Sequence, residues 1–261
     1  HAFLQSLSHI AENQRIAIGI DLRPSSPQIA LACIAAILES GYQVDYCGTL
    51  PTPALALYAK TLAIPAIMIT GSHIPFDRNG IKFYTASGEI SKSDEARISA
   101  ANVVTGNDPT GTDLPAVNPL ALQQYMNRYL NLFEQPPLSS MRIGVYEHSS
   151  VARDCLSAVL TGLGATVISI DRTDHFVPID TEAVSEEDHQ KAIAWSRQYQ
   201  LDSIVTTDGD GDRPLISDEH GNWLRGDIVG LLTAQFLNAA CVVTPISSNT
   251  AIEKSGWFKQ V

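Results

Sequence analysis

The sequence is poor in cysteine, and its four cysteines lie far apart, at Cys33, Cys47, Cys155 and Cys241. None of them belongs to a CxxC pair. Without such pairs, neither a thiolate metal site nor a disulfide framework is expected. This cysteine usage predicts a reducing compartment, which we take to be the cytoplasm.

Basic residues are also scarce. Lysine and arginine together number 17 against 28 aspartates and glutamates, which gives a formal net charge of −11. Nucleic acids and anionic membranes are bound by broad basic surfaces. The charge therefore argues against both partners, and it predicts that any anionic ligand is held by a small local cluster of cations.

Long apolar runs are missing as well. The longest, around residues 27–38, ends at Glu39 and is well short of the roughly 18–20 residues that a membrane span needs. The chain begins at His1, and its first ten residues lack the basic and then apolar pattern of a signal peptide. We expect it to begin inside a longer gene product and to be a fragment.

What the sequence does have is 261 residues with 44% hydrophobic content, enough for about two domains. Strand-like and helical segments alternate in the first half, with strands expected at residues 15–20, 42–46 and 66–70. Helices are expected between them, one with Ser26 as N-cap and Pro27 as first helical residue, and one over residues 53–60. This alternation predicts a largely parallel sheet with ligand loops at the carboxyl ends of its strands.

Two further helices are expected at residues 91–101 and 120–133, and Gln135-Pro136-Pro137 then predicts a linker. The second half alternates again, with strands expected at residues 141–146, 165–170, 203–206 and 214–217, and helices at 151–163 and 186–199. A third run contains helices over 227–237 and 250–255 and one strand over 241–243. One strand and two helices cannot cover both faces of a sheet, so the third run predicts an incomplete domain.

The predicted fold class is therefore α/β, built from successive domains with mixed or parallel sheets. The expected domain boundaries are 1–138, 139–223 and 224–261, the last domain being incomplete.

One loop with chemical potential follows the apolar strand at residues 66–69. It reads Thr70-Gly71-Ser72-His73-Ile74-Pro75, so Ser72 lies where a strand passes into an exposed loop. A serine there can accept a phosphoryl group if nearby cations neutralise the phosphate, and His73, Arg78 and Lys82 are suitable neighbours. The same glycines and prolines are also typical of plain turns, and both interpretations remain open at this point.

A second loop reads Asp208-Gly209-Asp210-Gly211-Asp212-Arg213. Its three alternating carboxylates can converge on one hard cation such as Mg²⁺, because the glycines let the backbone curl. An EF-hand also needs acidic first, third and fifth positions, and Glu219 falls at its last ligand position. However, its required sixth-position glycine is Arg213 here, and the preceding segment is strand-like. A plain acidic surface turn is the other alternative.

Together the two loops predict a site for phosphoryl transfer. This chemistry depends mainly on positioning and on neutralising charge, and Arg213 beside the carboxylates would suit a phosphate oxygen. Neither a G-x-x-x-x-G-K-[ST] loop nor a G-x-G-x-x-G turn is present, which argues against a nucleotide-dependent kinase or dehydrogenase. The other histidines show no metal-ligand spacing.

These motifs resemble those of the α-D-phosphohexomutase superfamily, in particular its bacterial phosphomannomutase/phosphoglucomutase branch. In order along nearly the whole chain they are Gly19-Ile20-Asp21-Leu22-Arg23, Thr52-Pro53, Thr70-Gly71-Ser72-His73, Asn79-Gly80-Ile81-Lys82 and residues 208–213. The chain is similar to the N-terminal part of that family, whose members have four successive domains.

The resemblance implies a phosphohexomutase that moves phosphate between the 1- and 6-positions of mannose or glucose. A hexose 1,6-bisphosphate would be its intermediate and activator. One Mg²⁺ per site would be held by Asp208, Asp210 and Asp212 together with a phosphate on Ser72.

The implied catalytic residues are Ser72 as the phosphoserine, His73 as a supporting group, Lys82 as a candidate general acid or base, and Arg213. The sequence also departs from the family pattern. Ile20 replaces a usual arginine, Ile74 a usual asparagine, and Pro214-Leu215 a small residue and glycine.

The family's early arginine-bearing segment, its sugar-recognition loop and its fourth domain have no counterpart in this sequence. A catalytically incomplete phosphosugar-binding or regulatory fragment of the same fold is therefore the alternative function. Neither the preferred sugar nor the oligomeric state can be predicted from the sequence.

Overall fold

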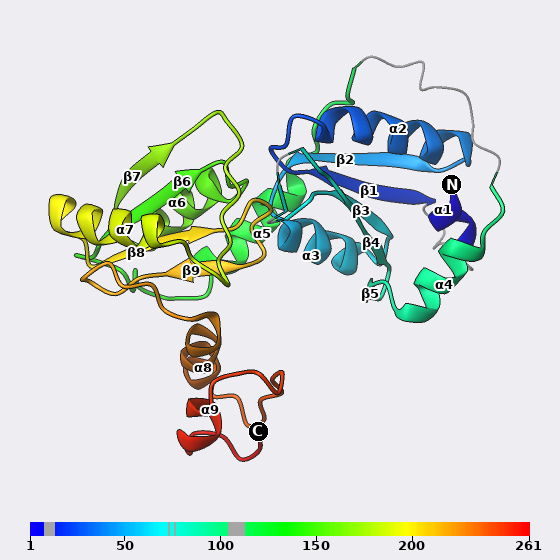
Figure 1. Cartoon of the computed structure of the whole chain (residues 1–261). Coiled ribbons are helices and arrows are strands. Elements are labelled where there is room, and N and C mark those ends of the chain that lie inside the picture. The colour runs from blue at the N-terminus through cyan, green and yellow to red at the C-terminus, as the bar shows by residue number, and fades with distance from the viewer. Residues whose placement is uncertain (8–13, 73, 76, 104–112) are drawn as a thin grey trace.

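A computed structural model of the chain describes residues 1–7, 14–72, 74–75, 77–103 and 113–261. It contains two α/β units, with helix α5 packed between them, followed by a helical C-terminal segment (Figure 1). The elements of the first unit are α1 (Ala2–Ser6), β1 (Arg15–Ile20), α2 (Ser26–Glu39), β2 (Gln43–Thr49), α3 (Thr52–Leu62), β3 (Ala66–Ile69), β4 (Ile81–Thr85), β5 (Gly88–Glu89), α4 (Lys92–Ala100) and α5 (Leu120–Leu130).

The first sheet is five-stranded in the order β2-β1-β3-β4-β5. Strands β2, β1 and β3 are parallel, whereas β4 pairs with β3, and β5 with β4, in antiparallel fashion. Side chains alternate across β1: Ile16 and Ile18 pack in the core beneath α2, and Ala17 packs in the core beneath α3. The two helices therefore cover opposite faces of the sheet, and the carboxyl ends of β1 and β3 meet at one edge.

The second unit is built in the same way around a four-stranded sheet in the order β7-β6-β8-β9. Its elements are β6 (Arg142–His148), α6 (Arg153–Gly162), β7 (Thr166–Arg172), α7 (Glu186–Tyr199), β8 (Ser203–Thr207) and β9 (Pro214–Ile216). Strands β7, β6 and β8 are parallel and β9 is antiparallel. Helix α7 closes one face through Ala192, which packs with Ile170 and Ile204 of the sheet.

The C-terminal segment contains α8 (Gly226–Phe236) and α9 (Ala251–Lys254), which lie together below the second unit in Figure 1. The strand expected at residues 241–243 is wrong. Only one isolated parallel bridge forms there, between Cys241 and Gln260, because no neighbouring strand is present among the described residues to extend a ladder.

One local expectation also needs correction. Ser26 is the first residue of α2 rather than its N-cap, and its hydroxyl donates a hydrogen bond to Asp21 instead of accepting one from the helix. The first sheet is mixed, as the expected fold class allows, because β4, which follows Asn79 and Gly80, pairs with β3 in antiparallel fashion. This strand places Lys82 directly opposite Met68 of β3.

No helix in the described part of the chain combines the length and the apolar character that crossing a membrane requires. All four cysteines are free thiols.

Candidate metal centre

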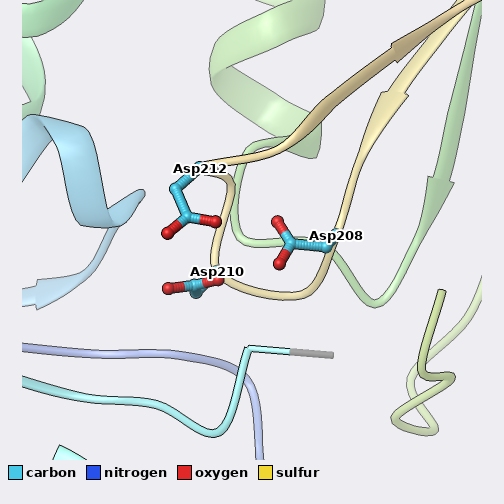
Figure 2. A group of neighbouring side chains, drawn as sticks. All are labelled: Asp208, Asp210 and Asp212. Atoms are coloured by element: carbon cyan, nitrogen blue, oxygen red, sulfur yellow. The ribbon is translucent and has the colours of Figure 1, made fainter. Parts of the chain in front are cut away.

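The three aspartates of the 208–213 loop lie together between β8 and β9. Each can offer one carboxylate oxygen such that the three oxygens lie within 4.8 Å of one another, and Figure 2 shows the three side chains converging from one curled loop. Asp208 and Asp210 are fully buried, whereas the side chain of Asp212 is 29% exposed. This arrangement presents a cluster of hard oxygen donors to one side of the loop.

Ser72 lies in the loop after β3, three residues beyond its end, and reaches across to this cluster. Its hydroxyl donates a hydrogen bond to Oδ2 of Asp208 over 2.6 Å, joining the first unit to the second. Its backbone N–H donates to Oγ1 of Thr70, and its φ of +50° lies in the left-handed region, which non-glycine residues rarely occupy. The loop thus holds the hydroxyl in a sharply turned conformation facing the carboxylates.

Lys82 provides the positive charge nearest to the acidic loop. Its ammonium lies 2.8 Å from Oδ2 of Asp210 and 2.8 Å from Oδ2 of Asp212. Burial by itself lowers the pKa of Lys82, but the two carboxylates outweigh that effect and raise it above its ordinary value. Lys82 is therefore a cation in this arrangement.

Asp210, in the second unit, is held by two residues of the first unit. Its Oδ2 accepts hydrogen bonds from Lys82 and from Oγ1 of Thr52, and its backbone carbonyl accepts one from the Thr52 N–H. Its other carboxylate oxygen, Oδ1, is buried and has no hydrogen-bond partner among the described residues. Because a buried carboxylate oxygen without a partner is costly, this atom indicates that the loop suits a divalent cation.

The pKa values of the two buried carboxylates shift in opposite directions. Burial and the nearby Asp210 raise the pKa of Asp208. Burial also acts to raise the pKa of Asp210, but Lys82 and the hydroxyl of Thr52 lower it below its ordinary value. The three carboxylates face Lys82 and, at the rim, Arg213, and a divalent cation among them would offset their mutual repulsion.

Arg213 follows the carboxylates at the start of the return strand. Its backbone N–H donates to Oδ1 of Asp208, and its guanidinium lies 3.5 Å from Glu182 and 3.9 Å from Asp212. The group is about one-third exposed, so it lies at the rim of the acidic loop, where it could meet a phosphate.

The local structure also decides between the two metal-loop alternatives. The loop connects two antiparallel strands, β8 and β9, whereas an EF-hand loop connects two helices. Glu219 lies in the turn after β9 with its side chain 66% exposed. The EF-hand interpretation is therefore excluded.

Of the residues predicted for the site, Ser72, Lys82, Asp208, Asp210, Asp212 and Arg213 are brought together. His73 lies outside the described residues. Sequence reasoning noted Thr52 only as part of a motif and did not place it in the site. Its signal was the Thr-Pro pair that begins α3, but the sequence does not show that this helix end meets a loop 158 residues away.

The chain matches two sequence descriptions of one protein family. Residues 1–103 match phosphoglucomutase/phosphomannomutase alpha/beta/alpha domain I, and residues 123–221 match alpha/beta/alpha domain II. The chain belongs to the phosphoglucomutase/phosphomannomutase family.

Named relatives agree with this family assignment. The chain is 52% identical to a phosphomannomutase of Salmonella muenchen over 94% of its own length and 51% of that protein. It is 44% identical to a phosphomannomutase of Sinorhizobium fredii, over 97% of this chain and 54% of that one. A phosphoglucosamine mutase of Deinococcus deserti is 31% identical, with 95% and 57% covered. The chain thus spans about half the length of these family members.

Solved structures of the phosphoglucomutase/phosphomannomutase family share the fold. A family protein from Burkholderia thailandensis superposes with a TM-score of 0.72 at 22% identity, covering 90% of this chain and 53% of that one. A structure from Thermus thermophilus gives a TM-score of 0.76 at 20% identity, covering 98% and 60%. The α/β architecture with mixed sheets is therefore that of the family.

Proposed function

We propose that the chain is the phosphoryl-carrying part of a phosphohexomutase, with Ser72 as the residue that becomes phosphorylated. The observation that carries the proposal is the 2.6 Å hydrogen bond from the Ser72 hydroxyl to Asp208, at the edge of a three-carboxylate loop. The names of the relatives at 52% and 44% identity support a hexose phosphate as substrate, with mannose favoured.

The proposed metal ligands are Asp208, Asp210 and Asp212, completed by a phosphate on Ser72. The orphaned Oδ1 of Asp210 supports this assignment. Bound there, one Mg²⁺ would neutralise negative charge on the phosphoryl group. Arg213 is proposed to bind a phosphate oxygen, and the supporting role of His73 stays a prediction.

The proposed transfer step is a displacement at phosphorus. A sugar hydroxyl oxygen forms a bond to the phosphorus as the bond from phosphorus to Oγ of Ser72 breaks. We assign the accompanying proton exchange to Lys82, whose ammonium gives a proton to Ser72 and whose amine takes the proton of the sugar hydroxyl. The hexose 1,6-bisphosphate formed in this way returns its other phosphate to Ser72 by the reverse step.

We also propose that the domains follow the boundaries 1–138, 139–223 and 224–261. The position of one sheet on each side of residue 138, and the absence of a third sheet from the described residues after 223, support this division. With these boundaries, the loop of Ser72 belongs to the first domain and the loop over residues 208–213 to the second.

The decisive experiment is covalent loading of Ser72. The chain is incubated with glucose 1,6-bisphosphate and Mg²⁺, and its intact mass is measured beside that of Ser72→Ala. One added phosphate is expected on the wild type and none on the variant. Lys82→Met tests the proton assignment, with a loading rate lower by at least about a hundredfold expected.

The outcomes separate the two functions that the sequence leaves open. A wild-type chain that binds hexose phosphate, by calorimetry, but takes up no phosphate would contradict the mutase proposal and favour a phosphosugar-binding fragment. In the natural full-length protein, a coupled assay comparing mannose 1-phosphate with glucose 1-phosphate identifies the preferred sugar.

A further inference from the structure

Arg23 is an arginine buried in the first unit without a role in the site as described so far. It lies in the turn after β1, and only 1% of its surface is exposed. Its Nε donates to Oδ2 of Asp21 over 3.1 Å, and its backbone N–H donates to the other oxygen of the same carboxylate. A buried arginine is uncommon unless its charge and its donors are used.

The remaining donors of Arg23 all point at the loop that carries Ser72. Nη2 donates to the backbone carbonyls of Ser72 and Ile74, over 2.8 and 2.7 Å. Nη1 donates to those of Pro75 and Arg78, over 2.8 and 3.0 Å. One rigid planar fork thus fixes four carbonyls of a loop about 50 residues away in sequence.

The surroundings are shaped to fit this guanidinium. A Cβ on Gly71 would lie 2.7 Å from Cζ of Arg23, so an alanine there would collide with the group. From the second unit, the ring of Phe176 covers the guanidinium with its centroid 4.2 Å away. The serine loop, the arginine and the opposite unit are therefore packed against one another.

From these contacts we infer that Arg23 is a positioning residue for Ser72. By holding the Ser72 carbonyl it keeps this residue in its left-handed conformation, with φ of +50°, and so keeps the hydroxyl facing Asp208. Phe176 seals the arrangement from the second unit. The inference rests on the proposed function, in which Ser72 carries the phosphate.

Arg23→Lys is the sharpest variant, because it keeps the positive charge beside Asp21 but replaces the fork with a single point donor. Arg153→Lys is its matched control. Arg153 also donates to two backbone carbonyls, those of His148 and Thr173, over 2.8 Å each, but it does so within the second unit. Comparing the two separates the serine loop from the general cost of losing arginine-to-carbonyl hydrogen bonds.

Three quantities are measured on each variant: the rate at which glucose 1,6-bisphosphate with Mg²⁺ phosphorylates Ser72, the Mg²⁺ affinity by calorimetry, and the urea midpoint. Arg23→Lys is expected to slow phosphorylation by at least about tenfold while its Mg²⁺ affinity stays within about twofold of wild type. Arg153→Lys is expected to load at the wild-type rate. Phe176→Leu is a milder change for the case in which Arg23→Lys folds poorly, and it is expected to slow the phosphorylation of Ser72 severalfold.

If Arg23→Lys is phosphorylated on Ser72 at the wild-type rate, the inference is overturned but the proposed function is not. If Arg23→Lys does not fold, a wild-type rate in Phe176→Leu has the same consequence. A parallel loss of loading, Mg²⁺ affinity and urea midpoint in the Arg23 and Arg153 variants also overturns the inference, because that pattern indicates a purely structural role. A wild-type chain that cannot be loaded overturns the proposed function together with the inference.

Discussion

At the scale of single residues, Asp210 is the proposed metal ligand with the most informative contacts. One of its carboxylate oxygens is held by Lys82 and Thr52, and the other is buried without a partner among the described residues. Asp210→Asn removes the charge but preserves the shape. We expect it to weaken Mg²⁺ binding by at least about tenfold, as measured by calorimetry, because an amide is a poorer ligand for a hard cation.

Glu219→Gln is the control for that measurement, since Glu219 is the residue an EF-hand would use as its last ligand. Its side chain is 66% exposed, and its variant should bind Mg²⁺ as the wild type does. Equal affinities in Asp210→Asn and the wild type would contradict the assignment of the metal site to this loop.

His148 predicts a pH dependence of stability. Its ring is buried, and Nε2 lies 2.9 Å from the carbonyl of Thr207 and 3.1 Å from Oγ1 of Thr206, while Nδ1 has no partner among the described residues. Burial lowers the pKa of His148 to about 4. In the unfolded chain the pKa of histidine is about 6.5, so the unfolded state binds a proton more readily.

The free energy of unfolding therefore falls as the pH drops from about 6.5 to about 4, because protonation favours the unfolded chain. The shift corresponds to a loss on the order of 3 kcal/mol over that window. Urea unfolding at pH 7 and pH 5 should show a steeper loss for the wild type than for His148→Gln, which keeps a donor but cannot titrate. If the free energy of unfolding falls equally between pH 7 and pH 5 in the two proteins, the role assigned to His148 is contradicted.

At the scale of elements, local signals located most helices well. Helix α7 covers residues 186–199 as the sequence predicts, because three acidic residues fill its first turn and Ser185 precedes them. The strand over Arg15–Ile20 is likewise where the apolar run places it. Local patterns suffice where caps and burial agree.

The elements that were missed depend on partners far away in the sequence. The sequence offers no prediction for strand β4, whose side chains are mostly half-buried and which depends on pairing with β3 on one side and β5 on the other. The prediction of a strand over 241–243 was wrong for the opposite reason. The local pattern suits a strand, but only Cys241 is paired, in a single bridge with Gln260. Strand formation requires a partner, and single-sequence patterns do not name it.

Helix α7 also allows a test of its N-terminal cap. The Ser185 hydroxyl accepts a hydrogen bond from the backbone N–H of Asp188 over 3.1 Å. Ser185→Ala should lower the free energy of unfolding by about 1 kcal/mol, whereas Ser185→Gly should lower it by only a few tenths. Urea titrations followed by circular dichroism compare the two; an alanine variant as stable as the glycine variant would speak against the cap.

At the scale of the whole molecule, the two units are joined through the acidic loop at residues 208–213. Thr52 donates to Asp210 with both its backbone N–H and its hydroxyl, over 2.8 and 2.6 Å. Thr52→Val removes only the second bond. We expect it to lower the free energy of unfolding by about 2 kcal/mol, because the acceptor is charged and buried.

Thr52→Ser is the matched variant for this contact, because it keeps the hydroxyl and loses one methyl group, worth about 0.8 kcal/mol. Urea unfolding of both variants measures the difference. If Thr52→Val proves no less stable than Thr52→Ser, the hydroxyl does not join the units.

The sequence predicted which residues gather at the candidate site better than it predicted the contacts that hold them there. Alternating carboxylates and a loop serine stand out as local patterns, so Ser72 and the three aspartates could be named in advance. Thr52, Arg23 and Phe176 could not, because an ordinary threonine, arginine or phenylalanine acquires its role only from the tertiary contacts that surround it.

The bond between Thr52 and Asp210 also bears on how such proteins can be recombined. A chimera that takes one unit from this chain and the other from a relative, joined at residues 135–137, interrupts no strand or helix. It nevertheless divides the acidic loop from the helix end that completes it. A functional chimera therefore requires that both source proteins have the residue pair found here at positions 52 and 210. This pair is a better criterion for choosing them than their overall sequence identity.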